Sequence, residues 1–220
     1  MKLPTSGLGT IISRRPRVTP VAAVLIGLGV SVALRALPPP PTEVGRTPVL
    51  QAVLDDAASP SAGPVSAALT VVVFTDYQCP ICRATDPALD KVRQQRPDVR
   101  FIYKDWPIFG LRSQYAARVA LAADRQGRYV VVHNALMQSP GLLDDDAVRR
   151  AAIGAGVDWP RLEADLARHG TAHDAQLKRH AFEAWSLGLE GTPGYVVGTD
   201  LYRGGLGELG LKRAIAHANR

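Results

Sequence analysis

Short apolar runs and the amphipathic stretches between them indicate a mixed α/β chain of 220 residues. Residues 69–74 are β-branched and uncharged, which is typical of a buried strand. Apolar residues then recur at helical spacing from Ile81 to Val92, so a helix follows this strand directly. Residues 99–103 predict a second strand. Because a helix joins the two strands, we expect them to run parallel.

A long helical stretch separates these strands from the end of the chain. Between about residues 112 and 187 the pattern is helical and rich in alanine. Asp144 is a candidate N-cap for a helix over 145–155, and Asp158 for a helix through 167. Thr171 and Asp174 resemble a capping box that starts another helix, ending near 185. A hairpin of residues 195–197 and 201–203 and a helix over 206–218 complete the chain.

The first 65 residues have a different pattern. A basic stretch at 14–17 precedes an apolar run over 18–34, so residues 1–37 predict a signal peptide or membrane anchor. The positive-inside rule favours an uncleaved anchor with its N-terminus in the cytoplasm. Residues 38–65 begin with four prolines and predict a Pro-rich linker, with a short helix or strand over 49–56. The folded domain is expected over 66–220.

The net charge of +6 does not indicate a nucleic-acid partner, because its excess lies in the N-terminal segment. Residues 1–37 hold five basic side chains and no acidic one, and the remaining chain has 21 basic against 20 acidic residues. We therefore expect no nucleic-acid binding, and membrane contact through the N-terminal segment only.

The only two cysteines, Cys79 and Cys82, lie where the first predicted strand ends and the following helix begins. A thiolate at a helix N-terminus is stabilised by free backbone N–H groups, which lower its pKa to roughly 3.5–7.5. Pro80 is tolerated in the first turn, and the N–H groups of Ile81 and Cys82 remain free to face the Cys79 sulfur. The spacing predicts that Cys79 is the nucleophile and the more exposed thiol, and that Cys82 resolves the mixed disulfide.

Other interpretations of this pair remain open. Two thiolates could carry zinc or copper, or the pair could be a permanent structural disulfide. No second C-x-x-C completes a four-cysteine zinc site, and Arg83 stands where a haem attachment motif has histidine. Three histidines could suggest a metal-binding helix face, but the predicted cap at Thr171 places the first outside the helix, and we expect surface histidines: His169, His173 and His180.

Three stretches resemble one known family. The motif Phe74-x-Asp76-Tyr77-x-Cys79-Pro80-x-Cys82, the segment 101–110 and the segment 191–198 are similar to DsbA-like thiol–disulfide oxidoreductases of the thioredoxin superfamily. The similarity extends from about residue 69 to the C-terminus. It implies a thioredoxin-like α/β fold with an inserted helical domain.

The resemblance also implies a function. Such a protein exchanges disulfides in cysteine-containing clients of the periplasm, with a membrane or soluble redox partner and without a cofactor or metal. In the family a cis-proline faces the thiols, and the residue before it pairs with the client backbone, which implies these roles for Pro193 and Thr192.

One departure from the family concerns proton transfer. Many thioredoxin-like enzymes place a buried carboxylate six residues before the first cysteine, where this chain has Val73. Asp76 is nearer to the motif, and if its carboxylate lay close to Cys79 it would raise the pKa of that thiol. The group that relays protons to Cys82 is therefore not identified by the sequence.

Overall fold

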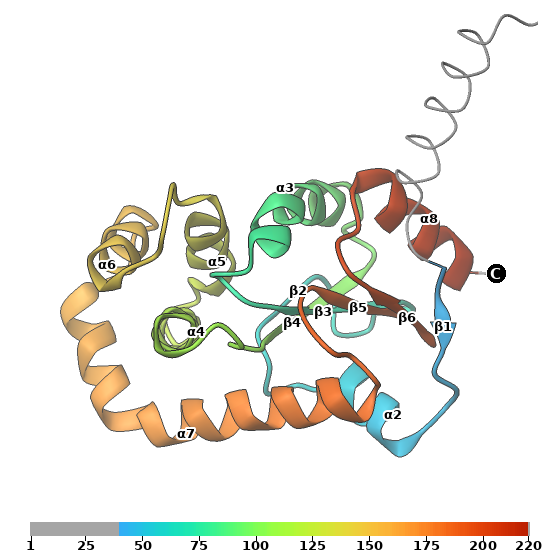
Figure 1. Ribbon diagram of the computed structural model, residues 1–220, viewed down its shortest axis with the longest axis horizontal. Helices are drawn as coiled ribbons and strands as arrows, with labels where there is room; N and C mark the ends of the chain where they lie inside the picture. Colours follow the sequence, from blue (N-terminus) through green and yellow to red (C-terminus); the bar gives the residue numbers. More distant parts are fainter. Residues whose placement is uncertain (1–39, 220) are drawn as a thin grey trace, which may run out of the picture. The chain divides into compact units, whose positions relative to one another are not determined.

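A mixed six-stranded sheet forms the centre of residues 40–219, the part of the chain that the computed structural model describes (Figure 1). The strand order is β1-β6-β5-β3-β4-β2. The predicted parallel pair is confirmed as β3 (Thr70–Thr75) and β4 (Arg100–Asp105). The predicted hairpin is β5 (Gly194–Val197) and β6 (Asp200–Arg203), and β5 runs antiparallel to β3.

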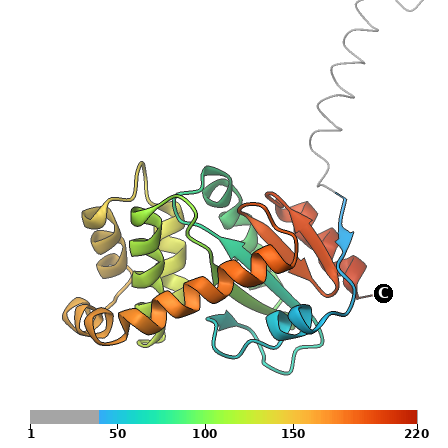
Figure 2. The same cartoon turned by 60° about the horizontal axis from the view of Figure 1, so that its bottom comes forward.

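Helices cover both faces of the sheet (Figure 1). On one face lie α3 (Pro80–Gln95) and α8 (Glu208–Ala218), and on the other lie α2 (Pro48–Leu54) and α7 (Trp159–Ser186). Figure 2 shows α7 crossing its face of the sheet on the same side as α2. Because side chains alternate along a strand, Val71 and Val73 of β3 pack with the core under α3, whereas Val72 and Phe74 pack with the α2 side.

The predicted helical insertion consists of α4 (Leu111–Asp124), α5 (Tyr129–Gln138), α6 (Asp145–Gly154) and α7, which returns to the sheet. The predicted N-caps are confirmed: the Asp144 side chain accepts from Ala147 N, and that of Asp158 from Arg161 N. The fold is thus thioredoxin-like, with a helical insertion between β4 and β5.

The predicted break before Thr171 is wrong. Helix α7 is continuous for 28 residues, and Gly170 and Thr171 lie inside it. An internal glycine costs about 1 kcal/mol, but one face of α7 stays in contact with the core along the whole helix. That face keeps helical spacing through these buried or partly buried positions: Leu162, Leu166, His173, Leu177, His180 and Ala184.

The predicted linker also differs from the structure. Residues 42–62 include β1 (Thr42–Glu43), which pairs with β6, and β2 (Ser61–Ala62), which pairs with β4. Between them lies α2, which begins after an N-cap at Thr47 and buries Leu50 and Val53 against the sheet. The Pro-, Ser- and Ala-rich composition concealed these pairings, because each strand is only two residues long. The predicted anchor or signal over 1–37 lies outside the described residues, and none of the described helices is long and apolar enough to span a membrane.

A buried ion cluster fastens this N-terminal segment to the domain. The Lys104 side chain of β4 is fully buried, and its Nζ contacts Asp56 Oδ2 and Glu183 Oε2 of α7, the latter at 2.8 Å. His180 lies beside it, with Nε2 2.9 Å from Ser59 Oγ and Nδ1 3.0 Å from the Asp105 carbonyl oxygen. Burial, together with the neighbouring Lys104, lowers the pKa of His180 to about 3, so this histidine is neutral.

The expectation of surface histidines is accordingly wrong at two of the three positions. His173 and His180 are 6% and 0% exposed, because they belong to the inward face of α7. No group of three or more potential ligands that could hold a metal ion occurs in residues 40–219.

Candidate active site

The two thiols lie at the N-terminus of α3, as the sequence predicts. Cys79 is the N-cap residue, and its Sγ accepts a hydrogen bond from the Cys82 backbone N–H at 3.3 Å. Both cysteines are free, so the structure describes the reduced form. Cys79 was expected to be the more exposed thiol, but the difference is small: Cys79 is 3% exposed and Cys82 is 2% exposed. Ile81, which lies between them in the sequence, is 54% exposed.

The two thiols differ strongly in acidity. A hydrogen bond from the Cys82 thiol is the main cause that lowers the pKa of Cys79 from 9.0 to about 6. This hydrogen bond outweighs burial, and the backbone N–H groups of Cys82 and Ile81 assist it. Burial is the main cause that raises the pKa of Cys82, followed by its hydrogen bond to Cys79. The arrangement therefore provides one thiolate near neutral pH and one thiol that keeps its proton.

The loop before β5 supplies the second part of the site. The Thr192–Pro193 peptide bond is cis, as the resemblance implied. The Cys79 thiol lies 3.3 Å from the carbonyl oxygen of Thr192, to which it donates. Thr192 Oγ1 is buried and has no hydrogen-bond partner among the described residues. The loop and the first cysteine are thus in direct contact, although 113 positions separate them in the sequence.

Asp76 does not face the thiols, which corrects the idea that its carboxylate could raise the Cys79 pKa. Its Oδ1 accepts from Gln78 N and Ser113 Oγ at 2.7 Å each. Its Oδ2 accepts from Ile108 N at 2.6 Å and Phe109 N at 3.1 Å. Four donors therefore hold this carboxylate, which ties the active-site turn to the loop after β4 and to α4.

A set of buried polar side chains beside α3 was missed in the sequence. It joins five groups in a row, which we call the buried polar chain: Asp86, His133, Tyr77, Tyr129 and Asp105. The only available signal was the position of Asp86, four residues after Cys82 on the same helix. Tyr77 lies in the turn before Cys79, but its partners come from α5 and β4, so no local pattern could reveal the row.

Exposed apolar side chains occur between the two cysteines and on two loops that are hydrogen-bonded to the active-site turn. Ile81, Phe109 and Leu142 are 54%, 52% and 60% exposed. The Leu142 loop is held beside α3 because Arg83 Nη1 donates to the Gly141 carbonyl oxygen at 2.6 Å. Such side chains offer contact area to a partly unfolded protein chain.

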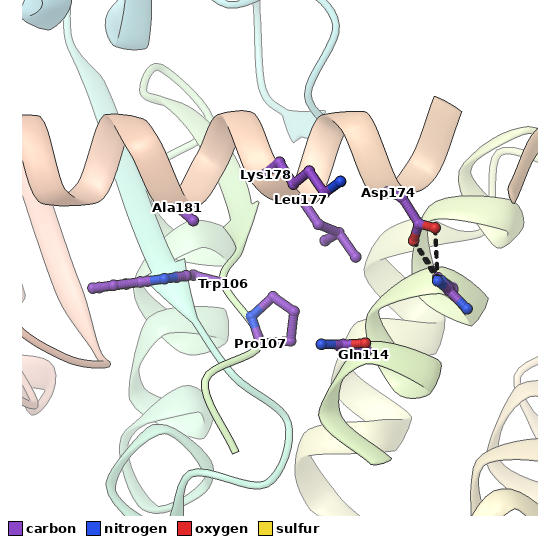
Figure 3. A pocket seen from close by; sticks show the side chains of 8 residues that line it. Trp106, Pro107, Gln114, Asp174, Leu177, Lys178 and Ala181 are labelled. Carbon is purple, nitrogen blue, oxygen red and sulfur yellow. Dashed lines mark hydrogen bonds and ion pairs between the residues drawn. The ribbon is translucent and has the colours of Figure 1, made fainter. Parts of the chain in front are cut away.

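A separate cavity of about 330 Å³ lies between α4, α7 and the loop after β4 (Figure 3). Its apolar wall is formed by Trp106, Pro107, Leu177 and Ala181, and its polar end by Gln114, Lys178 and the Arg118–Asp174 ion pair. Neither thiol and no residue of the proline loop lines it. The thiol site therefore does not share this cavity.

The thiolate can be tested by titration of the reduced protein. We expect a midpoint near pH 6 in the far-ultraviolet thiolate absorbance, and a higher midpoint in Cys82→Ala, which lacks the donating thiol. Because the folded pKa is lowered, the reduced form gains stability that is complete above pH 9 and is lost as the pH falls through about 6. At pH 7 the gain is about 1.4 kcal/mol, which makes the disulfide roughly 30 mV more oxidising. A midpoint near 9 would contradict the assignment.

Comparison with solved structures supports the architecture. A thioredoxin-like oxidoreductase from Silicibacter pomeroyi is 34% identical, with a TM-score of 0.72, and the match covers 77% of this chain and 96% of that one. The catalytic domain of Proteus mirabilis ScsC is 30% identical, with a TM-score of 0.68, over 77% and 93% of the two chains. The thiol–disulfide exchange protein α-DsbA2 of Wolbachia pipientis, 22% identical, shares the fold, with a TM-score of 0.72 over 76% and 90%.

The curated relatives are longer proteins. Na⁺/H⁺ antiporter NhaA 1 of Mycobacterium sp. (strain KMS) is 27% identical over 179 residues, which is 80% of this chain and 29% of the antiporter. The chain thus spans less than a third of the length of this relative. Residues 70–216 match the family described as DSBA-like thioredoxin domain, a stretch that includes both thiols and the proline loop. The chain therefore belongs to the DSBA-like thioredoxin domain family.

Proposed function

We propose that this protein is an exported thiol–disulfide oxidoreductase that exchanges disulfides in client proteins through Cys79 and Cys82. The observation that carries the proposal is the pairing of the two sulfurs at the start of α3. One is stabilised as a thiolate by the other thiol and by backbone N–H groups. The family and the structural neighbours named above support the same chemistry.

The reaction runs through a mixed disulfide. In the reducing direction the Cys79 thiolate attacks a client disulfide, one client thiolate leaves, and Cys79 is joined to the other client sulfur. Cys82 then loses its proton and attacks the Cys79 sulfur, which releases the second client thiolate and forms the Cys79–Cys82 disulfide. The oxidising direction reverses these steps, and electrons balance because one disulfide is exchanged for another.

The proline loop is the proposed client-binding element. Thr192 and Pro193 lie against Cys79, and an extended client segment there would pair with the Thr192 backbone. The exposed side chains of Ile81, Phe109 and Leu142 would contact apolar residues of the same client. Pro80 and Ile81 shape the first turn of α3, which keeps the N–H groups directed at the nucleophile.

We further infer an extracytoplasmic location. One structural neighbour is a periplasmic thioredoxin-like protein from Salmonella enterica serovar Typhimurium, 31% identical over 79% of this chain. The basic and apolar pattern of residues 1–37 supports export, with a tether to the inner membrane. A membrane or soluble redox partner would restore the pair after each turnover.

The test traps the intermediate. Cys82→Ser should accumulate a covalent adduct between Cys79 and a disulfide-containing client, whereas Cys79→Ser should trap none and lose exchange activity. The adduct is detected by non-reducing electrophoresis and must disappear on adding dithiothreitol. If neither variant traps a client, and the reduced wild type instead retains one equivalent of zinc or copper that Cys79→Ser loses, the protein is a metal carrier.

The direction of exchange follows from one measurement. A reduction potential near about −120 mV would identify an oxidant of clients, and one near about −270 mV a reductant. The lowered pKa of Cys79 favours the oxidising side, because it stabilises the reduced form.

A further inference from the structure

The sequence did not identify the group that accepts the proton of Cys82. Cys82 attacks only as a thiolate, yet burial raises its pKa well above the usual value, so its proton needs an acceptor within the protein. Val73 lies with the core beneath α3 and carries no titratable group. Asp76 is buried near the site, but each of its oxygens already accepts from two donors.

Two other buried carboxylates lie on the same side of the sheet, and each has an oxygen without a partner. Asp86 Oδ2 and Asp105 Oδ2 are buried and accept no hydrogen bond from the described residues. Asp86 follows Cys82 by four positions in α3, so the two side chains start from neighbouring positions one turn apart, with Cβ atoms about 5–6 Å from each other. Proton exchange between them would run directly or through one bridging water.

The other Asp86 oxygen begins the buried polar chain. Asp86 Oδ1 lies 2.9 Å from His133 Nε2, and His133 Nδ1 lies 3.0 Å from the Tyr77 hydroxyl. The Tyr77 hydroxyl lies 3.4 Å from that of Tyr129, which donates to Asp105 Oδ1 at 2.9 Å. The row therefore connects the helix that carries Cys82 with the end of β4, through the helical insertion.

The hydrogen bonds of this row leave one oxygen of Asp86 able to take a proton. When Asp86 is ionised, His133 donates to its Oδ1 from Nε2 and accepts from Tyr77 at Nδ1. A proton added to Oδ2 leaves both of these hydrogen bonds in place, so the imidazole stays neutral and keeps its tautomer.

We propose that the buried polar chain is the proton reservoir of Cys82, and that Asp86 exchanges the proton with this thiol; the proposal rests on the proposed function. In the reducing direction Asp86 takes the Cys82 proton as the Cys82 sulfur bonds to that of Cys79 and the client thiolate leaves. In the oxidising direction a client thiolate attacks Cys79, Cys82 leaves as a thiolate, and Asp86 returns the proton. Burial raises the pKa of Asp105 to about 6, so the far end of the chain takes up a proton only as the pH falls below neutral.

Other charged or titratable groups act on the same region. The charges of Asp86, Asp90 and Arg93 of α3 act on the hydroxyl group of Tyr103 in β4. The charges of Asp86 and Cys82 act on the hydroxyl group of Tyr195 in β5. Asp90 and Arg93 pair with each other at 2.6 Å, so the charges of this ion pair offset each other. Asp86 therefore remains the buried carboxylate of α3 that has an oxygen available.

The test separates the two thiols kinetically. Reduced protein is mixed with the aromatic disulfide 5,5′-dithiobis(2-nitrobenzoate) in a stopped-flow instrument. Attack by Cys79 releases the first chromophore, and attack by Cys82 on the resulting mixed disulfide releases the second. For Asp86→Asn we expect the first phase and its pH midpoint near 6 to be unchanged. The second phase should slow by about a hundredfold near neutral pH and should now keep rising with pH.

The control is Asp90→Asn, one turn further along α3, which should leave both phases unchanged. Tyr77→Phe interrupts the row without touching Asp86 and should also slow only the second phase, so it serves if Asp86→Asn does not fold. An unchanged second phase in a folded Asp86→Asn or Tyr77→Phe protein overturns the proposal. Failure of the first phase in wild type would instead contradict the proposed function.

Discussion

Lys104→Met is expected to lower the free energy of unfolding by about 3–5 kcal/mol. Methionine is unbranched like lysine and one atom shorter, so it keeps most of the apolar stem and removes the ammonium group with its charge and its hydrogen bonds. The side chain is fully buried, and its ammonium group lies between Asp56 and Glu183. The variant leaves these two carboxylates with only the partly exposed Arg179 to offset their charge. Urea unfolding followed by circular dichroism measures the loss.

Arg118→Met is the matched control. Its guanidinium group pairs with Asp174 at 2.6 Å, but both side chains are more than a third exposed. Water screens such a pair, and we expect a change of less than about 1 kcal/mol. Equal losses in the two variants would show that the buried cluster contributes no more than a surface ion pair.

The pH dependence of the Lys104→Met loss has a definite sign. In wild type, hydrogen bonds and the charge of Lys104 outweigh burial and hold the pKa of Asp56 well below its usual range. The stability that the lowered pKa of Asp56 contributes is fully present above the unfolded-state pKa near 4. It is lost as the pH falls through the lower folded-state pKa. In the variant a carboxylate of the cluster can take up a proton as the pH falls. The difference in free energy of unfolding between wild type and variant should therefore shrink between pH 7 and pH 4.

Asp76→Ala is expected to have the second large effect, a loss of about 3–5 kcal/mol, because it leaves four donors unsatisfied around one buried position. Three of them are backbone N–H groups, which no side-chain rotation can redirect. Exchange activity should fall as well, since the active-site turn and the loop after β4 lose their common acceptor. Thermal unfolding and client oxidation measured on the same sample report both effects.

Ser113→Ala is the comparison, because it removes one of the four donors and leaves the carboxylate in place. We expect a loss of about 1 kcal/mol. The midpoint of the Cys79 titration should stay near 6 in both folded variants, since Asp76 faces away from the thiols. A shift of that midpoint in Asp76→Ala would indicate that the Asp76 carboxylate does act on the pKa of Cys79.

The local chemistry of the thiol pair was readable from the sequence. A β-branched run followed at once by helical spacing predicted the strand-to-helix junction, and Cys79 is the N-cap residue of that helix. The helix caps at Asp144 and Asp158 were likewise predicted, because a cap is formed within a few residues of itself. The cis Thr192–Pro193 bond followed from the family resemblance, since spacing alone does not distinguish cis from trans.

The errors have a common physical origin. Gly170 and Thr171 looked like a helix boundary, and residues 38–65 looked like a linker, because both judgements used local composition. In the structure a continuous buried face keeps α7 intact, and pairing with β6 and β4 turns two-residue segments into strands. Contacts with distant elements outweighed the local preference in each case.

The succession of a strand, a C-x-x-C pair and a helix could be predicted from the sequence, because these features depend on neighbours along the chain. Which groups surround the pair depends on how distant elements pack. This packing turned Asp76 toward the loop after β4, buried Lys104 between two carboxylates, and lined up Asp86, His133 and Tyr77 beside α3. Burial by elements far apart in sequence is the main cause that raises the pKa of Cys82, whereas the pKa of Cys79 is lowered mainly by Cys82, three residues away.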